Sequence, residues 1–169
     1  MIPTAMPSPI LTAFERATVG RSCEVSKREC DWDFTFGGGP SDGCAIAAQT
    51  FWRVVAGGRI VVTSKDDGHR FGLPAPLDAE EVCQRSLRGG VAISVDVDPV
   101  TGDIAIRLDN DTRLDILTTS SGYESWQAFF RDADQDVTLV GAGGGELSFV
   151  SEPAGSNAAV VVGHPLPSS

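Results

Sequence analysis

The strongest constraint on the fold of this chain is an alternation of apolar and polar side chains between residues 91 and 117. Apolar residues occupy every second position from 91 to 97. Because side chains on a strand point alternately to its two faces, this period predicts a half-buried antiparallel strand. Turns rich in Asp, Asn and Gly follow at 98–102 and 109–111, and the alternation returns after each of them. The sequence therefore predicts a three-stranded meander with its apolar side chains inward.

Shorter β-prone segments flank the meander. Aromatic and polar side chains alternate at 31–36, which predicts a strand with three rings on one face. Two runs at 45–55 and 59–63 are joined by Ala-Gly-Gly, where glycine supplies the positive φ that tight hairpin turns require. Two further short strands are predicted at 137–140 and 146–150.

Two helices are also predicted. Asp78 is a good N-cap with Glu81 three residues later, and apolar side chains recur at helical spacing over 79–88. Ser8 and the proline after it begin a shorter helix that ends near Gly20. About seven strands with hairpin connections and no β-α-β alternation predict an α+β fold, an antiparallel sheet (hairpin plus meander) packed on one main helix. A small β-barrel is the alternative.

The length of 169 residues indicates one domain. Pro, Ser, Gly and Ala dominate residues 1–8 and 151–169, and such segments have little to bury. We therefore expect a single α+β domain over residues 9–150 between two flexible tails.

The balance of charges restricts the partners. The chain has 23 acidic and 13 basic side chains, a net charge of −10, and a surface of that sign repels phosphate backbones and anionic lipids. Nucleic acid and membranes are therefore not expected as partners. Residues 91–136 hold ten acidic and three basic side chains, so the outward face of the meander is expected to be acidic. Such a face is either merely solvated or a docking surface for a basic protein.

The termini and cysteines suggest a compartment. The first 20 residues lack the features of a signal peptide, and no apolar run approaches the roughly 20 residues of a membrane helix. A cytoplasmic location with four reduced cysteines is expected, and a Cys23–Cys30 bridge is the alternative. The cysteines form no C-x2-C pair, and neither His69 nor His164 lies at zinc-finger distance from them. No metal or other cofactor is expected.

Candidate binding residues gather in a polar and aromatic insert after the meander, which we expect to form a helical turn through 129–130. Loops that follow a strand end often carry function, and Tyr and Trp bring a large contact area at low entropic cost. We predict a Tyr-Glu-x-Trp binding loop here, and the alternative is that its two rings cap the open end of the core. The candidate residues are Ser120, Ser121, Tyr123, Glu124 and Trp126.

Three further candidates could serve catalysis or binding. His69 lies in a loop with two aspartates, where an imidazole can act as a general base near neutral pH. A small hydrolase or metal-assisted enzyme would combine His69 with Glu124, Asp31 or a serine, although no nucleophile motif frames the serines. Asp31 and Asp33 share one face of a predicted strand, the geometry of paired carboxylates. We assign no catalytic residue.

The motifs CDWDFTFGGG at 30–39, FGLP at 71–74 and SSGYESW at 120–126 occur together. Over about residues 20–150 the chain resembles small uncharacterised bacterial proteins with a strand-helix-meander body, and it is more distantly similar to immunity proteins that neutralise toxins. The resemblance implies a bacterial, non-enzymatic protein-binding domain, which would use the acidic sheet face and the Tyr-Glu-x-Trp loop. The alternatives are the small enzyme described above and a structural homo-oligomer, and the chain is expected to be a monomer or homodimer.

Overall fold

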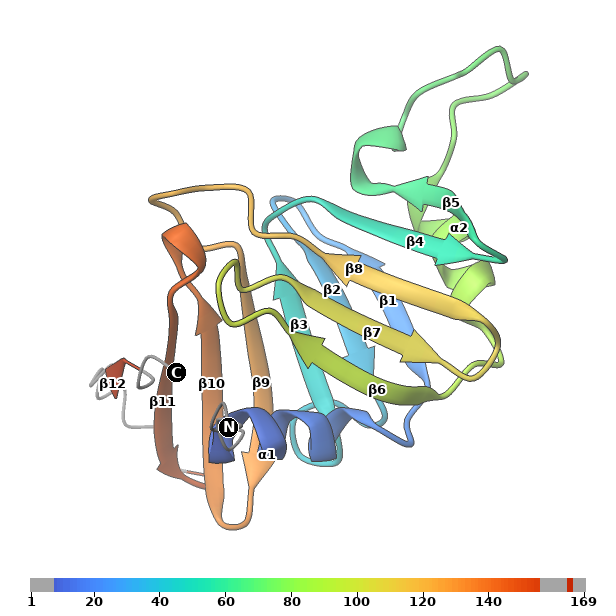
Figure 1. Cartoon of the computed structure of the whole chain (residues 1–169). Helices are drawn as coiled ribbons and strands as arrows, with labels where there is room; N and C mark the ends of the chain where they lie inside the picture. The colour runs from blue at the N-terminus through green and yellow to red at the C-terminus, as the bar shows by residue number, and fades with distance from the viewer. Residues whose placement is uncertain (1–7, 156–163, 166–169) are drawn as a thin grey trace, which may run out of the picture.

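The structure is a computed structural model that describes residues 8–155 and 164–165, and these form two antiparallel sheets and two α-helices (Figure 1). The larger sheet has the strand order β1-β2-β3-β9-β10-β11-β12, and the smaller has the order β5-β4-β8-β7-β6. The strands of the larger sheet are β1 (Cys23–Lys27), β2 (Trp32–Phe36), β3 (Cys44–Ala48), β9 (Trp126–Asp132), β10 (Gln135–Gly141), β11 (Leu147–Pro153) and β12 (His164–Pro165). Those of the smaller sheet are β4 (Trp52–Ala56), β5 (Arg59–Thr63), β6 (Ala92–Val97), β7 (Ile104–Leu108) and β8 (Thr112–Ile116). The helices are α1 (Pro9–Thr18) and α2 (Ala79–Leu87), with short 3-10 turns η1 (Ser64–Asp66) and η2 (Gly143–Gly145).

The predicted α+β class with antiparallel strands is confirmed, but the single sheet of about seven strands is wrong. The run predicted as one strand at 45–55 holds two strands in different sheets, since β3 ends at Ala48 and β4 begins at Trp52. The residues between them cross from one sheet to the other: the amide of Gln49 donates to the carbonyl of Ser125 (2.9 Å), and the amide of Leu117 donates to the carbonyl of Phe51 (2.9 Å). The described strands form two open sheets and no closed barrel.

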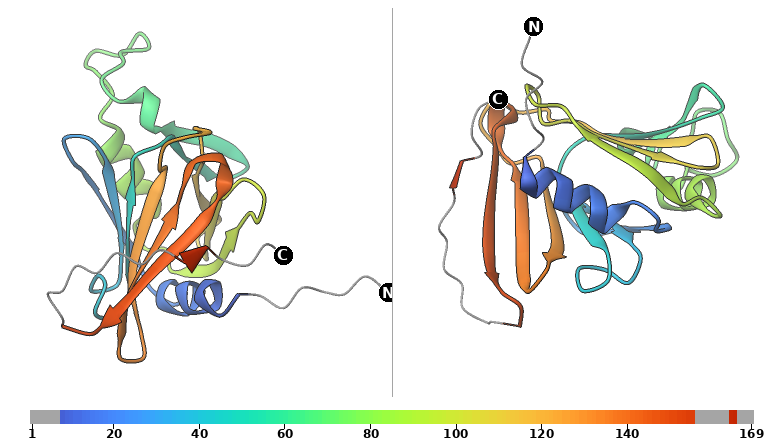
Figure 2. Two further views of the ribbon diagram at one scale, coloured as in Figure 1. Left: turned by 90° about the vertical axis from the view of Figure 1, so that its left-hand side faces the viewer. Right: turned by 60° about the horizontal axis from the view of Figure 1, so that its bottom comes forward.

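Both predicted helices are present, and they close the sides of the space between the sheets (Figures 1 and 2). Helix α1 contacts β6 of the smaller sheet and β3 and β9 of the larger one, whereas α2 contacts the edge strands β1 and β5. Asp78 caps α2 as predicted, because its Oδ1 accepts a hydrogen bond from the amide of Glu81 (3.1 Å). Among the described residues, neither helix has the length and apolar character needed to cross a bilayer.

The predicted meander is formed by β6, β7 and β8, and the predicted hairpin by β4 and β5. Ile104, Ile106 and Leu108 are buried as expected. The first strand departs from the pattern, since Ala92 is buried and Ile93 is 56% exposed. The cause is a shift in the register of β6 against β7 just after Ala92, because one extra residue in a strand turns the side chains before it to the opposite face.

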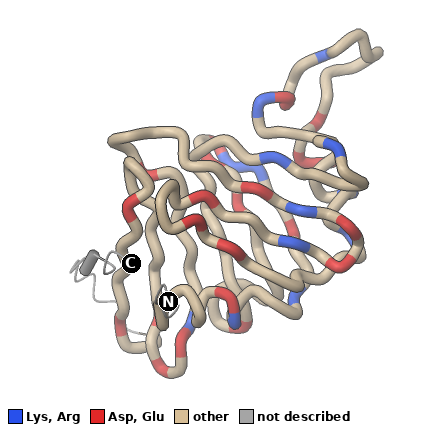
Figure 3. The backbone as a smooth tube through the Cα atoms, in the orientation of Figure 1, with Lys and Arg blue, Asp and Glu red and all other residues tan. Residues whose placement is uncertain are grey.

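The outward face of the smaller sheet is not uniformly acidic, contrary to expectation. Arg107 and Arg113 from the meander and Arg53 from β4 interleave with Asp96 and Asp115 on this face. Figure 3 shows that basic and acidic positions both occur along the strands of this sheet. Most of the remaining carboxylates of the meander lie in its two turns. The acidic excess of this segment therefore does not form a single negative surface.

The insert after the meander differs most from the prediction. The helical turn expected through 129–130 is instead β9, which pairs with β3 and β10 inside the larger sheet. The predicted strands at 137–140 and 146–150 are β10 and β11, and β11 continues to Pro153, three residues into the expected tail. The rest of the expected tails, residues 1–7, 156–163 and 166–169, lies outside the described residues.

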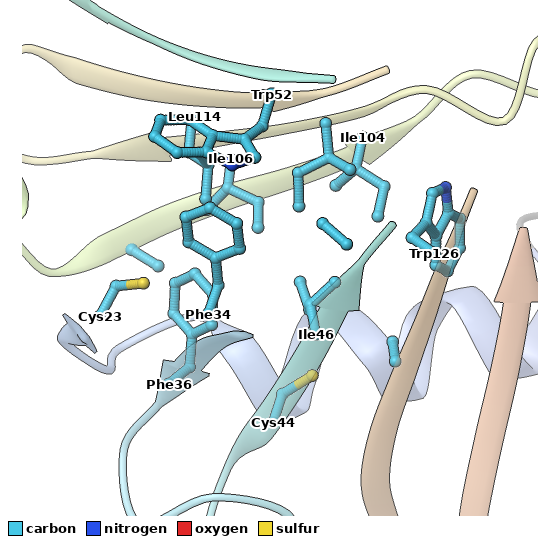
Figure 4. Packing of buried hydrophobic residues seen from close by; sticks show 14 of the residues in the cluster. Cys23, Phe34, Phe36, Cys44, Ile46, Trp52, Ile104, Ile106, Leu114 and Trp126 are labelled. Atoms are coloured by element: carbon cyan, nitrogen blue, oxygen red, sulfur yellow. The ribbon is translucent and has the colours of Figure 1, made fainter. Parts of the chain in front are cut away.

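The core fills the space between the sheets, where large side chains from the smaller sheet face those of the larger one (Figure 4). Trp52 meets Phe34 edge to face, with ring centroids 5.5 Å apart. Trp126 stacks on Phe14 of α1, with ring centroids 6.4 Å apart, and its Nε1 donates to the carbonyl of Gly102 (2.9 Å). These aromatic contacts join both sheets and α1 into one core.

Candidate functional site

The loop between β5 and α2 projects from the body of the protein (Figures 1 and 2). Its residues 68–76, which we call the tip loop, are all exposed. Phe71 is 66% exposed and Leu73 is 48% exposed, two residues apart. Apolar side chains that gather on an exposed loop are typical of contact surfaces for other molecules.

The base of the tip loop is firmly held. The amide of Gly68 donates to the carbonyl of Leu77 (2.8 Å), and the amide of Leu77 donates to the carbonyl of His69 (2.8 Å). Asp67 forms an ion pair with Lys27 of β1 and accepts a hydrogen bond from the first amide of α2 (3.0 Å). The hydrogen bond from Lys27 holds the pKa of Asp67 below its usual value. The loop is therefore fixed to the body at both ends.

Phe71 has an unusual backbone conformation for its residue type. Its φ is +45°, in the left-handed region that a bulky side chain adopts only at a cost in free energy. The amide of Leu73 donates to the carbonyl of Arg70 (2.6 Å) and closes the turn, while the His69 ring stacks beside Phe71 with centroids 5.5 Å apart. Because the Phe71 ring remains largely in solvent, core packing does not offset this strain.

A hollow of about 580 Å³ lies beside the base of the loop at one end of the sandwich. We call it the aromatic hollow, because Trp32 and Phe51 line it, together with Ser64 and Lys65 of η1. Lys65 Nζ is 5.8 Å from the Phe51 ring centroid, and Lys27 Nζ is 5.8 Å from the Trp32 ring centroid. Such geometry allows cation–π attraction, and the volume is that of an ordinary binding cleft.

One exposed thiol lines the aromatic hollow. Cys30 lines it and is exposed, whereas Cys23, Cys44 and Cys83 are buried, and all four cysteines are free. Burial raises the pKa of Cys23, and raises the pKa of Cys44 and of Cys83 to about 12. The alternative Cys23–Cys30 bridge is not formed.

The structure divides the predicted Tyr-Glu-x-Trp loop. Tyr123 is 82% exposed, and Glu124 accepts a hydrogen bond from the side chain of Gln127 (2.9 Å). Ser120 Oγ accepts hydrogen bonds from the amides of residues 122 (3.1 Å) and 123 (2.9 Å), so it shapes the turn, and Ser121 is exposed. Trp126 is fully buried, so it belongs to the core and offers no surface for contact.

The residues of the enzyme hypothesis are not brought together. The loop with His69 and the loop with Glu124 lie on opposite sides of the molecule in Figure 1. Asp33 is paired with Arg28 (2.7 Å), and the half-buried Asp31 also interacts electrostatically with Arg28. Among the described residues, no three His, Cys, Asp or Glu side chains are grouped to hold a metal ion. Within residues 8–155, the candidates His69, Glu124 and Asp31 therefore do not form a joint site.

A scan against known protein families and searches of curated proteins and of solved structures found no match. The resemblance to bacterial proteins and to toxin-neutralising immunity proteins therefore stays a prediction.

From the sequence we selected His69 of the tip loop and the FGLP motif at 71–74, but we did not identify Phe71 and Leu73 as contact residues, although a signal was present. Residues 71–76 read Phe-Gly-Leu-Pro-Ala-Pro, in which large apolar residues alternate with residues that interrupt helices and strands. Apolar side chains that no regular element can carry into a core remain on the surface. This pattern could have identified the loop.

Proposed function

We propose that this chain is a non-enzymatic domain that binds another protein, and that it does so with the tip loop and the adjoining aromatic hollow. The observation that carries the proposal is Phe71, which is exposed and strained at the end of a firmly anchored loop. Strain of this kind persists where a function requires the conformation. The partner in this proposal offers an apolar pocket that receives Phe71 and Leu73.

Anchoring at the base favours tight binding by the tip loop. Association costs free energy for every segment that must be ordered, and a loop already held in one conformation avoids that cost. Aromatic anchors surrounded by contacts that exclude water dominate the energetics of many interfaces. The aromatic hollow lies at the base of the loop, since Ser64 and Lys65 line it just before the loop begins. An apolar side chain of the partner can occupy it.

The loop between β8 and β9 reaches the aromatic hollow from the side away from the tip loop. Thr119 lines the aromatic hollow, so the segment with Ser120, Ser121 and the exposed Tyr123 starts at its rim. The only ionisable side chains of the tip loop are His69 and Arg70, whereas the whole chain carries −10. The proposed contact is therefore mainly apolar, while the net charge steers a basic partner toward it. A toxin is the partner that the resemblance implies.

Site-specific crosslinking in the cells that make the protein tests this proposal. A photoreactive phenylalanine analogue at position 71 should give one discrete adduct with another protein, and Leu73→Asp in the same chain should abolish it. Val100 is the matched control, because it is 77% exposed in the turn between β6 and β7, away from the tip loop. No adduct from position 71, or the same adduct from position 100, would contradict the proposal.

A stability measurement separates binding from folding at Phe71. Phe71→Gly should change the free energy of unfolding by less than about 1 kcal/mol, because relief of backbone strain offsets the greater freedom of glycine in the unfolded chain. Urea unfolding followed by circular dichroism measures this. A much larger loss would show that Phe71 supports the fold and would remove the argument from strain.

A further inference from the structure

The outward face of the smaller sheet carries two rows of side chains that the strand register defines. Residues directly opposite one another on neighbouring antiparallel strands share a face and lie side by side. The first row runs across β4, β8, β7 and β6 as Arg53, Asp115, Ala105 and Asp96. The second row runs across the same strands as Val55, Arg113, Arg107 and Ser94.

Two of the three arginines on this face share one carboxylate, that of Asp115. Asp115 accepts hydrogen bonds from Arg53 Nε (2.9 Å) and from Arg113 Nε (2.7 Å) and Nη2 (3.0 Å). Arg107 and Asp96 are exposed and form no ion pair within residues 8–155. Arg107 stands directly opposite Arg113, and like charges at opposed positions destabilise a sheet. Arg107 and Asp96 line the same hollow without forming an ion pair with each other, so each is free to pair with a charge from outside the chain.

The first row contains a depression that could hold a long basic side chain between two carboxylates. Ala105 stands between Asp115 and Asp96 in the first row, and these residues line a hollow of about 480 Å³. A guanidinium placed over the small Ala105 side chain would lie between two carboxylates, the geometry that arginine favours. The neighbouring row of the same face projects such a group, Arg107.

We propose that this face binds a second copy of the chain, face to face. The two copies are related by a two-fold axis that lies between the two faces and runs across the strands at the level of Ile106. That rotation reverses the strand direction and lays the first row of one copy on the second row of the other. Arg107 of each copy then enters the hollow over Ala105 of the other copy, between Asp96 and Asp115. A two-fold interface makes each such contact twice, so both unneutralised charges gain partners.

The size of the face sets the expected strength. Five strands spaced about 4.8 Å apart and about five residues long cover roughly 24 by 17 Å, which is small for a protein interface. We therefore expect a dimer that forms reversibly with rising concentration. The tip loop lies outside both rows, so this inference stands apart from the proposed function.

Charge reversal in the full chain tests the pairing. Sedimentation equilibrium at moderate ionic strength should show a concentration-dependent dimer for the natural sequence. Arg107→Asp and Asp96→Arg should each weaken dimerisation at least tenfold, because each variant places like charges together across the interface. The double variant should restore it to within about threefold, since the same two positions again carry opposite charges.

Arg88→Asp is the matched control. Arg88 is exposed after the end of α2, and its replacement changes the net charge as much as Arg107→Asp does. It should leave dimerisation unchanged, as should Phe71→Gly. The proposal is overturned by a natural protein that stays monomeric at all concentrations, by an Arg107→Asp variant that still dimerises, by a double variant that does not recover, or by an equal loss in the control.

Discussion

Gly141→Ala is a sharp test of how Trp126 is packed. Gly141 lies opposite Trp126 in the β9–β10 pair, and a Cβ at position 141 would lie 2.5 Å from Nε1 and 2.9 Å from Cδ2 of the indole. The ring has little freedom to move, because Nε1 donates to the carbonyl of Gly102 and the indole stacks on Phe14. The backbone of Gly141 has no positive φ, so only the lack of space opposes alanine.

The expected magnitude follows from two opposing effects. Overpacking a core costs about 1–3 kcal/mol, and replacing glycine by alanine returns about 0.4–1 kcal/mol through the unfolded chain. With an immobile ring we expect Gly141→Ala to lower the free energy of unfolding by about 2 kcal/mol, measured by urea unfolding. In a Trp126→Leu background the same change should cost less than about 0.5 kcal/mol, a clear coupling between the two sites.

A second glycine provides the control for this cycle. A Cβ at Gly122 meets nothing within 4 Å, and its φ is not positive, so Gly122→Ala should stay within about 0.5 kcal/mol of the natural protein. Equal costs of Gly141→Ala with and without the indole would refute the packing described here.

Two further predictions concern ionisable groups. In the native protein Cys30 alone should react quickly with a thiol reagent at pH 8, and all four thiols should react after denaturation, since the others are buried; a second fast thiol would contradict the core. Burial raises the pKa of Asp115, but hydrogen bonds from Arg113 and Arg53 outweigh it and set that pKa below its usual value. The stability that this carboxylate contributes is therefore present above about pH 4 and is lost as the pH falls further. Asp115→Asn should lower the free energy of unfolding by about 1–3 kcal/mol at pH 7. This is less than the cost of breaking a fully buried ion pair, because both arginines are partly exposed. Unfolding curves at pH 7 and pH 3 check this, and an equal difference between variant and natural protein at both pH values would contradict it.

Local patterns in the sequence predicted the parts of the fold that depend on neighbouring residues. The Asp78 cap, the alternation in β7 and the glycines of the β4–β5 turn act within a few residues, and each prediction is confirmed. The division into two sheets depends on strands far apart in the chain, because β3 pairs with β9 and β4 with β8. No local pattern carries that information, so the β-prone run at 45–55 predicts one strand where the structure has two.

The candidate site shows the same distinction. Tyr123 is exposed as its polar surroundings suggest, but Trp126, three residues later, is the first inward residue of β9. The alternation from Trp126 to Phe130 was available in the sequence, yet the serines and glycine before it favoured a loop. The distribution of charge on a sheet face could not be predicted from the sequence either, because the strand register decides which residues become neighbours across strands.

Two energetically unfavourable features of the described residues are the basis of the two binding surfaces that we propose. Phe71 holds a left-handed conformation without packing against a core, and Arg107 lies opposite Arg113 and forms no ion pair within residues 8–155. Natural sequences are mostly free of such local conflicts, and the exceptions concentrate where function requires them. A contact outside the single chain would offset each cost, through an apolar pocket for the Phe71 ring and a second copy for Arg107. Because the two features lie on different parts of the molecule, a partner protein and a second copy can bind at the same time.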